Sequence, residues 1–266
     1  MKRKREELRK TGFYFIGFTI LLIAVSAGKP IVSGVFDWSK FKTVRTHTGS
    51  VINILKGPTR SLDMFDIKAI SLHSGKATHT YLVGKESDEL LIVKEGYAEI
   101  TINSISNLLC EGSIAVASQG DRVQVKNIKP GNLVYYSVVF KPRPAKIHRE
   151  TSKKVSPFFS SWDTISFKPS ASGGRRNIIQ QPTSTLKQLE IHTTTLKEGL
   201  PSHAAHTHPD EEIILVRLGT VDQTISGTHY RLGPGSLIFA TNDDLHGISN
   251  AGEGQCEYYA IRWLTY

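Results

Sequence analysis

The chain has 266 residues, a length compatible with one or two domains. It contains 33 Lys and Arg against 24 Asp and Glu, but six of the basic and two of the acidic residues lie in the first 27 positions. The rest therefore has 27 basic and 22 acidic residues, a net charge of +5. This mild excess is scattered apart from Arg149, Lys153 and Lys154, and no alternation of basic and aromatic residues suits base stacking, so nucleic acid is excluded as an expected partner.

The first 27 residues have the three-part pattern of a secretory signal peptide. Residues 1–10 are rich in Lys and Arg, residues 13–25 are largely apolar, and small residues precede a cleavage site before Gly28. The apolar run is shorter than the about 20 residues that a comfortable membrane span needs. We expect residues 1–27 to be removed and the protein to be exported, periplasmic or extracellular, with no stable membrane association afterwards. An uncleaved N-terminal anchor is the alternative.

The chain contains an internal repeat. Residues 89–127 align without a gap with residues 212–250, at an offset of 123, and upstream segments align at an offset of 124. The aligned pairs include Trp38 and Trp162, Gly75 and Gly199, Gly96 and Gly219, Gly112 and Gly235, and Asn127 and Asn250. The repeat predicts two copies of one domain, residues 28–141 and 162–266.

Short apolar stretches bounded by Gly, Asn and Pro predict β-strands throughout both copies. We expect hairpins over residues 89–102 and 212–225, turning near Gly96 and Gly219, and a closing strand over residues 258–264. No long helical stripe follows the signal segment, so the fold class is all-β.

Residues 142–161 have no partner in the repeat and are rich in Pro, Lys and Ser, which indicates a linker. The two cysteines, Cys110 and Cys256, occupy non-equivalent positions in the two copies. We expect two separate buried thiols, although an exported protein could oxidise them.

A cluster of potential metal ligands lies in the second copy. His206 and His208 are one residue apart, Glu212 follows after three more, and His246 lies 34 residues beyond Glu212. Residues at i and i+2 share a face of a strand, whereas on a helix the two rings would point roughly 200° apart, so the pair predicts a strand. Three imidazoles and a carboxylate suit a transition metal. A histidine-rich surface loop is the alternative interpretation.

The residues around this cluster resemble the two motifs of the cupin family. The matching positions are Gly199, His206, His208, Glu212 and Gly219 in the first motif, and Gly235, His246 and Asn250 in the second. Thr241 and Asp243 stand where the family has Pro and Gly, in the turn between strands. All four metal-ligand positions of the family are matched.

Together with the repeat, the resemblance covers nearly all of the chain after the signal segment. It implies a bicupin, two tandem jelly-roll β-barrels, similar to ureidoglycine aminohydrolase-like bicupins in which a single barrel carries the metal. It also implies one divalent transition metal, Mn, Fe, Ni, Co, Cu or Zn, bound by His206, His208, Glu212 and His246. The fold is compatible with a homodimer.

The first copy lacks most of these ligands. Opposite His206 and His208 it has Val83 and Lys85 at one offset, or Leu82 and Gly84 at the other, and opposite His246 it has Val123. Glu89 alone remains, and one carboxylate does not hold a transition metal against water. We expect the first barrel to be metal-free and to serve packing, barrel pairing or lid formation.

Other candidate binding residues carry weaker signals. His203 lies just upstream of the first motif, where we expect a residue at the mouth of the pocket or a packed histidine. Arg262 and Tyr258 share one face of the predicted closing strand, and an inward Arg262 would bind an anionic group, although a solvent-facing arginine is the alternative. Glu211 points away from Glu212 and is expected to be solvated, and Arg175-Arg176 is expected on the surface.

These features favour an exported metal-dependent bicupin that acts on a small polar metabolite, such as an acidic sugar or ureido compound. The expected class is a hydrolase, isomerase or lyase, and the sequence assigns no catalytic side chain. An iron- or copper-dependent dioxygenase is one alternative. A non-catalytic sugar- or metal-binding module is the other.

Overall fold

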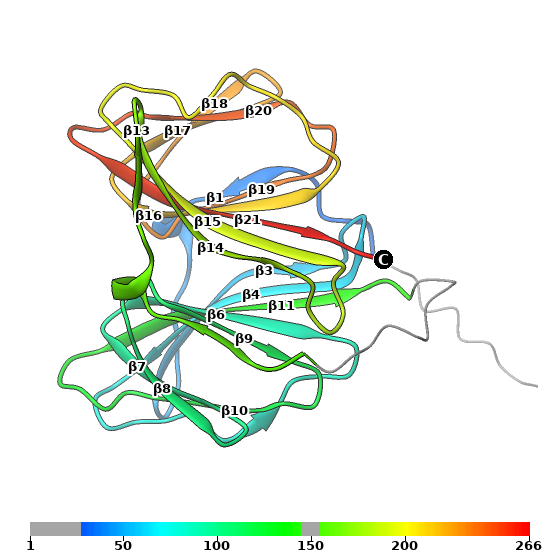
Figure 1. Ribbon diagram of the computed structural model, residues 1–266, viewed down its shortest axis with the longest axis vertical. Helices are drawn as coiled ribbons and strands as arrows, with labels where there is room; N and C mark the ends of the chain where they lie inside the picture. The colour runs from blue at the N-terminus through cyan, green and yellow to red at the C-terminus, as the bar shows by residue number, and fades with distance from the viewer. Residues whose placement is uncertain (1–27, 145–154) are drawn as a thin grey trace, which may run out of the picture.

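The structure, a computed structural model, describes residues 28–144 and 155–266. The predicted signal segment and the middle of the predicted linker lie outside the described residues. Within them, the chain forms four β-sheets stacked as two jelly-roll barrels, one above the other (Figure 1). The predicted all-β fold of two tandem barrels is confirmed.

Each barrel pairs an outer sheet with a larger inner sheet. In spatial order, the inner sheet of the N-terminal barrel contains β12 (Phe158–Ser160), β9 (Ile114–Ser118), β6 (Asp88–Glu95), β11 (Leu133–Pro142), β4 (Leu62–Leu72), β3 (Gly49–Gly57) and β2 (Val44–Arg45). Its outer sheet contains β5 (Tyr81–Leu82), β10 (Arg122–Lys126), β7 (Tyr97–Ile102) and β8 (Ile105–Cys110).

The C-terminal barrel repeats this arrangement. Its inner sheet contains, in spatial order, β1 (Gly34–Phe36), β19 (Leu237–Ala240), β16 (Glu211–Leu218), β21 (Cys256–Leu264), β15 (Gln188–Leu196), β14 (Gly173–Gln181) and β13 (Lys168–Ser170). Its outer sheet contains β18 (Thr228–Leu232), β17 (Val221–Ile225) and β20 (His246–Asn250). The predicted closing strand is thus the central strand β21. None of the helical segments in the described residues, such as the 3₁₀ turns Trp38–Lys40 and Trp162–Thr164, is long and apolar enough to cross a membrane.

The two inner sheets pack face to face and share one hydrophobic core. Phe65 and Phe140 from the first barrel meet Trp263 from the second, with ring centroids 5.0 and 5.2 Å from the indole. Because side chains alternate along a strand, Ile213 of β16 enters this shared core while Ile214 enters the core inside the C-terminal barrel. Burial on both faces explains the continuous apolar run of β16.

The predicted hairpins at Gly96 and Gly219 are wrong. β6 and β7, and likewise β16 and β17, lie in different sheets and do not pair. The chain turns a corner between the inner and outer sheets at Gly96, where φ is +82°, and a Cβ atom there would lie 2.7 Å from the carbonyl oxygen of Asn132. Gly219 has φ of +72° and is equally crowded. The glycines therefore mark barrel corners, a feature that the alternation pattern does not distinguish from hairpin turns.

The inner sheet of each barrel is completed by one strand, here called an arm, that leads into the other barrel. β1, at the start of the described residues, pairs with β19 of the C-terminal barrel, and β12, within the predicted linker of residues 142–161, pairs with β9 of the N-terminal barrel. After each arm strand, a tryptophan covers a glycine of the receiving barrel: Trp38 covers Gly235 and Trp162 covers Gly112. The reciprocal arms tie the two barrels together, and the proposed domain boundaries at 141/142 and 161/162 remain predictions.

Two buried carboxylates close the contact between barrels. Glu211 accepts hydrogen bonds from the Thr59 hydroxyl at 2.7 Å, from the Arg60 amide at 2.9 Å and from Ser61. Glu211 is 3% exposed, so the expectation that it is solvated is wrong: it points away from Glu212, as predicted, but the other barrel covers that face.

Asp88, the repeat partner of Glu211, does the same in the opposite direction. It accepts hydrogen bonds from the Thr183 hydroxyl at 2.5 Å, from the Thr185 amide at 3.1 Å and from the Ser118 hydroxyl at 2.6 Å. Each barrel therefore inserts one carboxylate into a Thr-containing turn of the other.

The two cysteines are not bonded to each other, as predicted. Cys256 is buried, whereas Cys110 is only half-buried.

Replacing Asp88 by Ala should lower the free energy of unfolding by about 2–4 kcal/mol, because the hydroxyl and amide donors around it lose their acceptor in a buried site. Urea unfolding of the metal-free protein measures this. The control is Asp63→Ala, whose carboxylate is 51% exposed and pairs with Lys141 at 3.7 Å. It should change stability by no more than about 0.5 kcal/mol. Equal effects of the two variants would contradict the interdomain role of Asp88.

Candidate metal centre

The four predicted ligands come together inside the C-terminal barrel. Glu212 lies on β16 and His246 begins β20, while His206 and His208 lie in an extended segment before β16. The backbones of His206 and His246 exchange two hydrogen bonds, of 2.9 and 3.0 Å. The predicted strand over His206 and His208 is reduced to this single bridge, since the carbonyl oxygen of His208 accepts from the Asp243 amide at 3.3 Å, outside the ladder register.

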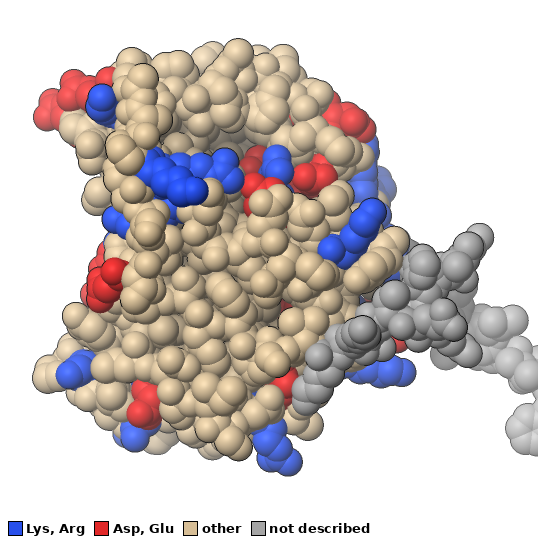
Figure 2. All heavy atoms as spheres, in the orientation of Figure 1, with Lys and Arg blue, Asp and Glu red and all other residues tan. Residues whose placement is uncertain are grey.

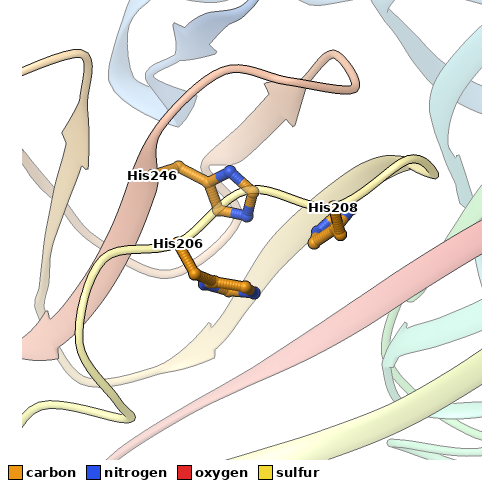
Figure 3. Close-up of side chains that lie close together, drawn as sticks. All are labelled: His206, His208 and His246. Atoms are coloured by element: carbon orange, nitrogen blue, oxygen red, sulfur yellow. The ribbon is translucent and has the colours of Figure 1, made fainter.

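The three imidazoles converge on one point (Figure 3). Their ligand atoms lie within 4.8 Å of one another, and in the described residues no other group of three His, Cys, Asp or Glu side chains could hold a metal ion. Ring centroids are 4.9 to 5.3 Å apart. The His triad can therefore bind a metal.

The backbone fixes which nitrogens face the centre. Nδ1 of His208 lies 2.9 Å from the carbonyl oxygen of Asp210, and Nδ1 of His246 lies 2.8 Å from that of Asp244. A carbonyl oxygen only accepts, so each Nδ1 carries the proton and each Nε2 presents a lone pair. This is the outer contact typical of metal-binding histidines.

The side-chain atoms that face the centre leave room for a cation between them. Nε2 of His208 and Nε2 of His246 each lie 3.3 Å from Oε2 of Glu212. With both neutral imidazoles protonated at Nδ1, two lone pairs and a carboxylate oxygen face each other. Nε2 of His246 also has no hydrogen-bond partner among the described residues although it is buried. A divalent ion satisfies all three groups at once, so the residues fit a metal.

Glu212 favours positive charge beside it. Burial raises its pKa, but hydrogen bonds and charge from His208 and His246, when these rings are protonated, outweigh burial and lower the pKa to about 2. A metal ion would supply the same positive charge with both rings neutral. For His206, burial and the neighbouring imidazoles lower the pKa. For His246, burial lowers the pKa, but Glu212 and the Asp244 carbonyl raise it by more, so this ring is more readily protonated than His206.

The centre opens into a cavity of about 410 Å³. The predicted residues His203, Arg262 and Tyr258 all line it. His203 is exposed, with its ring 4.3 Å from that of His206, as expected for a residue at the mouth. Arg262 points inward, so the solvent-facing alternative is wrong. Tyr259, on the other face of β21, donates a hydrogen bond across the barrel contact to the carbonyl oxygen of Gly112 at 2.8 Å.

Sequence reasoning missed a second group of polar residues on the cavity wall: Arg175, Glu190 and His192. Nη2 of Arg262 donates to Glu190 at 2.7 Å, and Nη2 of Arg175 donates to Glu190 at 3.2 Å. Arg175 is exposed, as expected, but its side chain lies at the rim of the cavity. The alternating polar residues Glu190, His192 and Thr194 on β15 were the available signal, since one face of a strand carries them all.

Strand pairing places these charges in a row. Arg262 on β21 lies between Glu190 on β15 and Glu212 on β16, directly across from both. His192 is the next residue after Glu190 on the cavity face of β15. Burial and the nearby Arg175 lower its pKa to about 4, so its imidazole is neutral at pH 7. Figure 2 shows basic and acidic groups side by side below a hollow in the C-terminal barrel.

The comparisons with known proteins agree with this architecture. Residues 192–262, which hold all four candidate ligands, match the family model of the cupin domain. A comparison with curated protein sequences gives no match.

Solved structures share the fold over most of both chains. Protein Ylba from E. coli matches with a TM-score of 0.69 and 13% identity over 89% of this chain and 94% of that one. Oxalate decarboxylase from Lactobacillus farciminis, in a formate complex, matches with a TM-score of 0.70 and 12% identity over 89% and 88%. A putative glyoxylate induced protein from Pseudomonas aeruginosa matches with a TM-score of 0.68 and 13% identity over 84% of each chain.

Two tandem jelly-roll barrels and a convergent His triad define a bicupin. Residues 192–262, in the C-terminal barrel, match the cupin domain, and both barrels have the cupin fold.

Metal occupancy should fall on acidification, because each histidine binds only when neutral and protons compete below about pH 6.5. His246, whose pKa is raised, should be protonated before His206, whose pKa is lowered. We expect near-full occupancy at about pH 7.5, a small fraction at about pH 5, and recovery on neutralisation. Elemental analysis after dialysis at each pH measures this. Unchanged occupancy at about pH 5 would show that the histidines are not the ligands.

Proposed function

We propose that the protein is an exported, metal-dependent bicupin enzyme that acts on a small metabolite carrying a carboxylate. The observation that carries the proposal is the cavity in which His206, His208, His246 and Glu212 face Arg262 and Arg175. Acidic sugars and ureido acids are the expected substrate classes, and hydrolysis, isomerisation or lyase chemistry the expected reaction types.

His206, His208, Glu212 and His246 would hold the ion, and the N-terminal barrel would hold none. When bound, a divalent ion would supply positive charge that polarises a carboxylate or carbonyl oxygen of the substrate. The donor set, three nitrogens and one oxygen, leaves coordination positions for such a ligand and is compatible with Mn, Fe, Co, Ni, Cu or Zn.

Arg262 is proposed to orient the substrate carboxylate. Its Nη2 is held by Glu190, and its buried Nε has no hydrogen-bond partner among the described residues, although Asp210 lies 3.7 Å away. The side chain is 29% exposed, toward the cavity. A guanidinium fixed at one end and free at the other binds a carboxylate in a defined orientation.

His192 is proposed to move a proton at Nε2, with Nδ1 turned toward Glu190. Nδ1 is buried, lies 3.5 Å from Oε1 of Glu190, and forms no hydrogen bond with any described residue. A neutral imidazole beside a carboxylate can accept a proton from the substrate and be stabilised as a cation by Glu190.

The fold relatives support small carboxylates as the substrate class. One is named oxalate decarboxylase and was solved with formate, and another is named a glyoxylate induced protein. The proposed homodimer and the proposed export both remain to be tested. N-terminal sequencing of extracytoplasmic protein should give Gly28 as the first residue if export is right.

The function is tested by loading the purified chain in turn with each candidate metal and screening oxalate, glyoxylate, uronic acids and ureido acids for turnover. We expect turnover of at least one carboxylate and none by the His246→Ala variant. Oxygen uptake with iron or copper would instead identify a dioxygenase. Binding of a sugar or of metal without any turnover would identify a binding module and overturn the proposal.

Two cavity variants should separate binding from chemistry. Arg262→Gln should raise KM by about tenfold or more, since a charge-assisted hydrogen bond is lost. His192→Gln should lower kcat by about a hundredfold with metal content unchanged. Arg231→Gln on β18, outside the cavity, is the matched control and should leave both constants unchanged. A wild-type kcat for His192→Gln would remove His192 from the mechanism.

A further inference from the structure

The N-terminal barrel holds a cavity of its own, of about 520 Å³, at the position equivalent to the metal-bearing cavity. Its floor is built from the same strands of the repeat: β4, β11 and β6 stand where β15, β21 and β16 stand in the second barrel. A volume in this range is typical of small-molecule sites. The cavity is open even though this barrel lacks the three histidines of the metal centre.

Strand pairing shows what replaced the ligands. Tyr81 pairs with Val123 as His206 pairs with His246, and the carbonyl of Val83 accepts from Gly120 as that of His208 accepts from Asp243. Tyr81 and Val83 thus stand in place of His206 and His208, one or two residues before the positions that sequence alignment suggested. Five residues separate Val83 from Glu89 where three separate His208 from Glu212, which accounts for the difference.

Glu89 no longer needs a cation. The Tyr81 hydroxyl lies 3.0 Å from both carboxylate oxygens, and the Ser137 hydroxyl donates to Oε1 at 2.5 Å. Burial raises the pKa of Glu89, while the hydrogen bonds from Ser137 and Tyr81 act in the opposite direction. The two hydroxyls therefore satisfy Glu89 in place of the metal ligands of the other barrel.

Two donors line the same cavity, Tyr135 and Lys68. Tyr258 in the second barrel hydrogen-bonds to Thr194 and Ser202, but its counterpart Tyr135 faces Ile70 where Thr194 would be. Tyr135 is 1% exposed and lines the cavity. Burial raises its pKa, so it stays a donor.

Lys68 supplies a positive charge on the strand next to Tyr135. Lys68 lies 3.1 Å from Asp66, but Lys56 also lies 3.4 Å from Asp66, so two lysines share one carboxylate. Lys68 pairs across the ladder with Ser137, the next inward position after Tyr135, so ammonium and hydroxyl are diagonal neighbours on the floor. One carboxylate group can accept from both.

One side of the wall is apolar, formed by Val51, Ile70, Leu72 and Val139, and Val51 and Val139 stand where the other cavity has Arg175 and Arg262. The remaining lining is polar and includes Thr46, Thr48, Thr78 and His79. The apolar side therefore favours an anion with an apolar body over a sugar or a dicarboxylate.

We propose that the N-terminal cavity is a second, metal-independent binding site for a small monocarboxylate with an apolar body, held by Lys68 and Tyr135. This site is separate from the proposed catalytic centre and does not depend on it.

Calorimetric titration of the metal-loaded chain with benzoate and with butyrate tests the proposal, with benzamide as the uncharged control. We expect saturable binding of one carboxylate probe per N-terminal cavity, and benzamide weaker by about tenfold or more. Lys68→Met should weaken binding by about tenfold or more, and Tyr135→Phe, which keeps the ring, by several-fold. Lys76→Met, an exposed lysine outside the cavity, should bind like the wild type.

The His246→Ala chain locates the site. Binding should persist in that variant, because the metal centre is not used. Loss of binding in His246→Ala with retention in Lys68→Met would place the probe in the other cavity and overturn the proposal. So would the absence of saturable binding up to about 10 mM of either probe. Thermal melts of each variant establish that the fold is intact, and Tyr135→Phe, an isosteric change, decides the case if Lys68→Met is unfolded.

Discussion

The face-to-face packing of the two inner sheets is the constraint on which the rest of the molecule depends. Each inner strand is buried on both faces, so its register fixes two surfaces at once: Ile213 enters the shared core only if Glu212 points into the C-terminal barrel. A slip by one residue would put an apolar side chain at the metal centre and a carboxylate among the aromatic rings of Phe65 and Trp263. Glu211 reinforces the same register, because its carboxylate reaches the turn at Thr59 only from the opposite face. The alternation of side chains along β16 therefore fixes both the packing of the shared core and the position of the candidate metal ligand Glu212.

The duplication explains how one chain carries two different cavities. The shared core, the reciprocal arms and the Asp88 and Glu211 contacts are symmetric, so both barrels are held to one architecture. Inside the barrels no such constraint applies, and the inward positions differ: His246 against Val123, Arg262 against Val139, His192 against Lys68. Pairing through the outer faces leaves each interior free to change its chemistry.

The sequence predicted the fold well because its signals are periodic or repeated. The offset between the copies, the Gly-bounded strands and the two cupin motifs sufficed for two all-β barrels, and the spacing of His206, His208, Glu212 and His246 identified side chains that the structure brings together. Their binding of a metal, the export of the chain and the domain boundaries remain predictions.

The sequence did not show which part of the molecule packs against each face of a strand. Glu211 was expected in water because alternation gives its direction but not the second barrel that covers it. His192 and Arg175 were missed because they come from strands remote from both motifs and reach the cavity only through the sheet. Gly96 was misread because a barrel corner and a hairpin turn use the same residue.

The central claim is that one metal ion binds to the histidine centre of the C-terminal barrel. Elemental analysis of the purified chain, compared with its His246→Ala and Glu89→Ala variants, tests it most directly. The account predicts about one transition-metal ion per chain, with none in His246→Ala and one in Glu89→Ala, since one of four bonds is lost in the first case and none in the second. Two ions per chain, or an unchanged ion in His246→Ala, would contradict it.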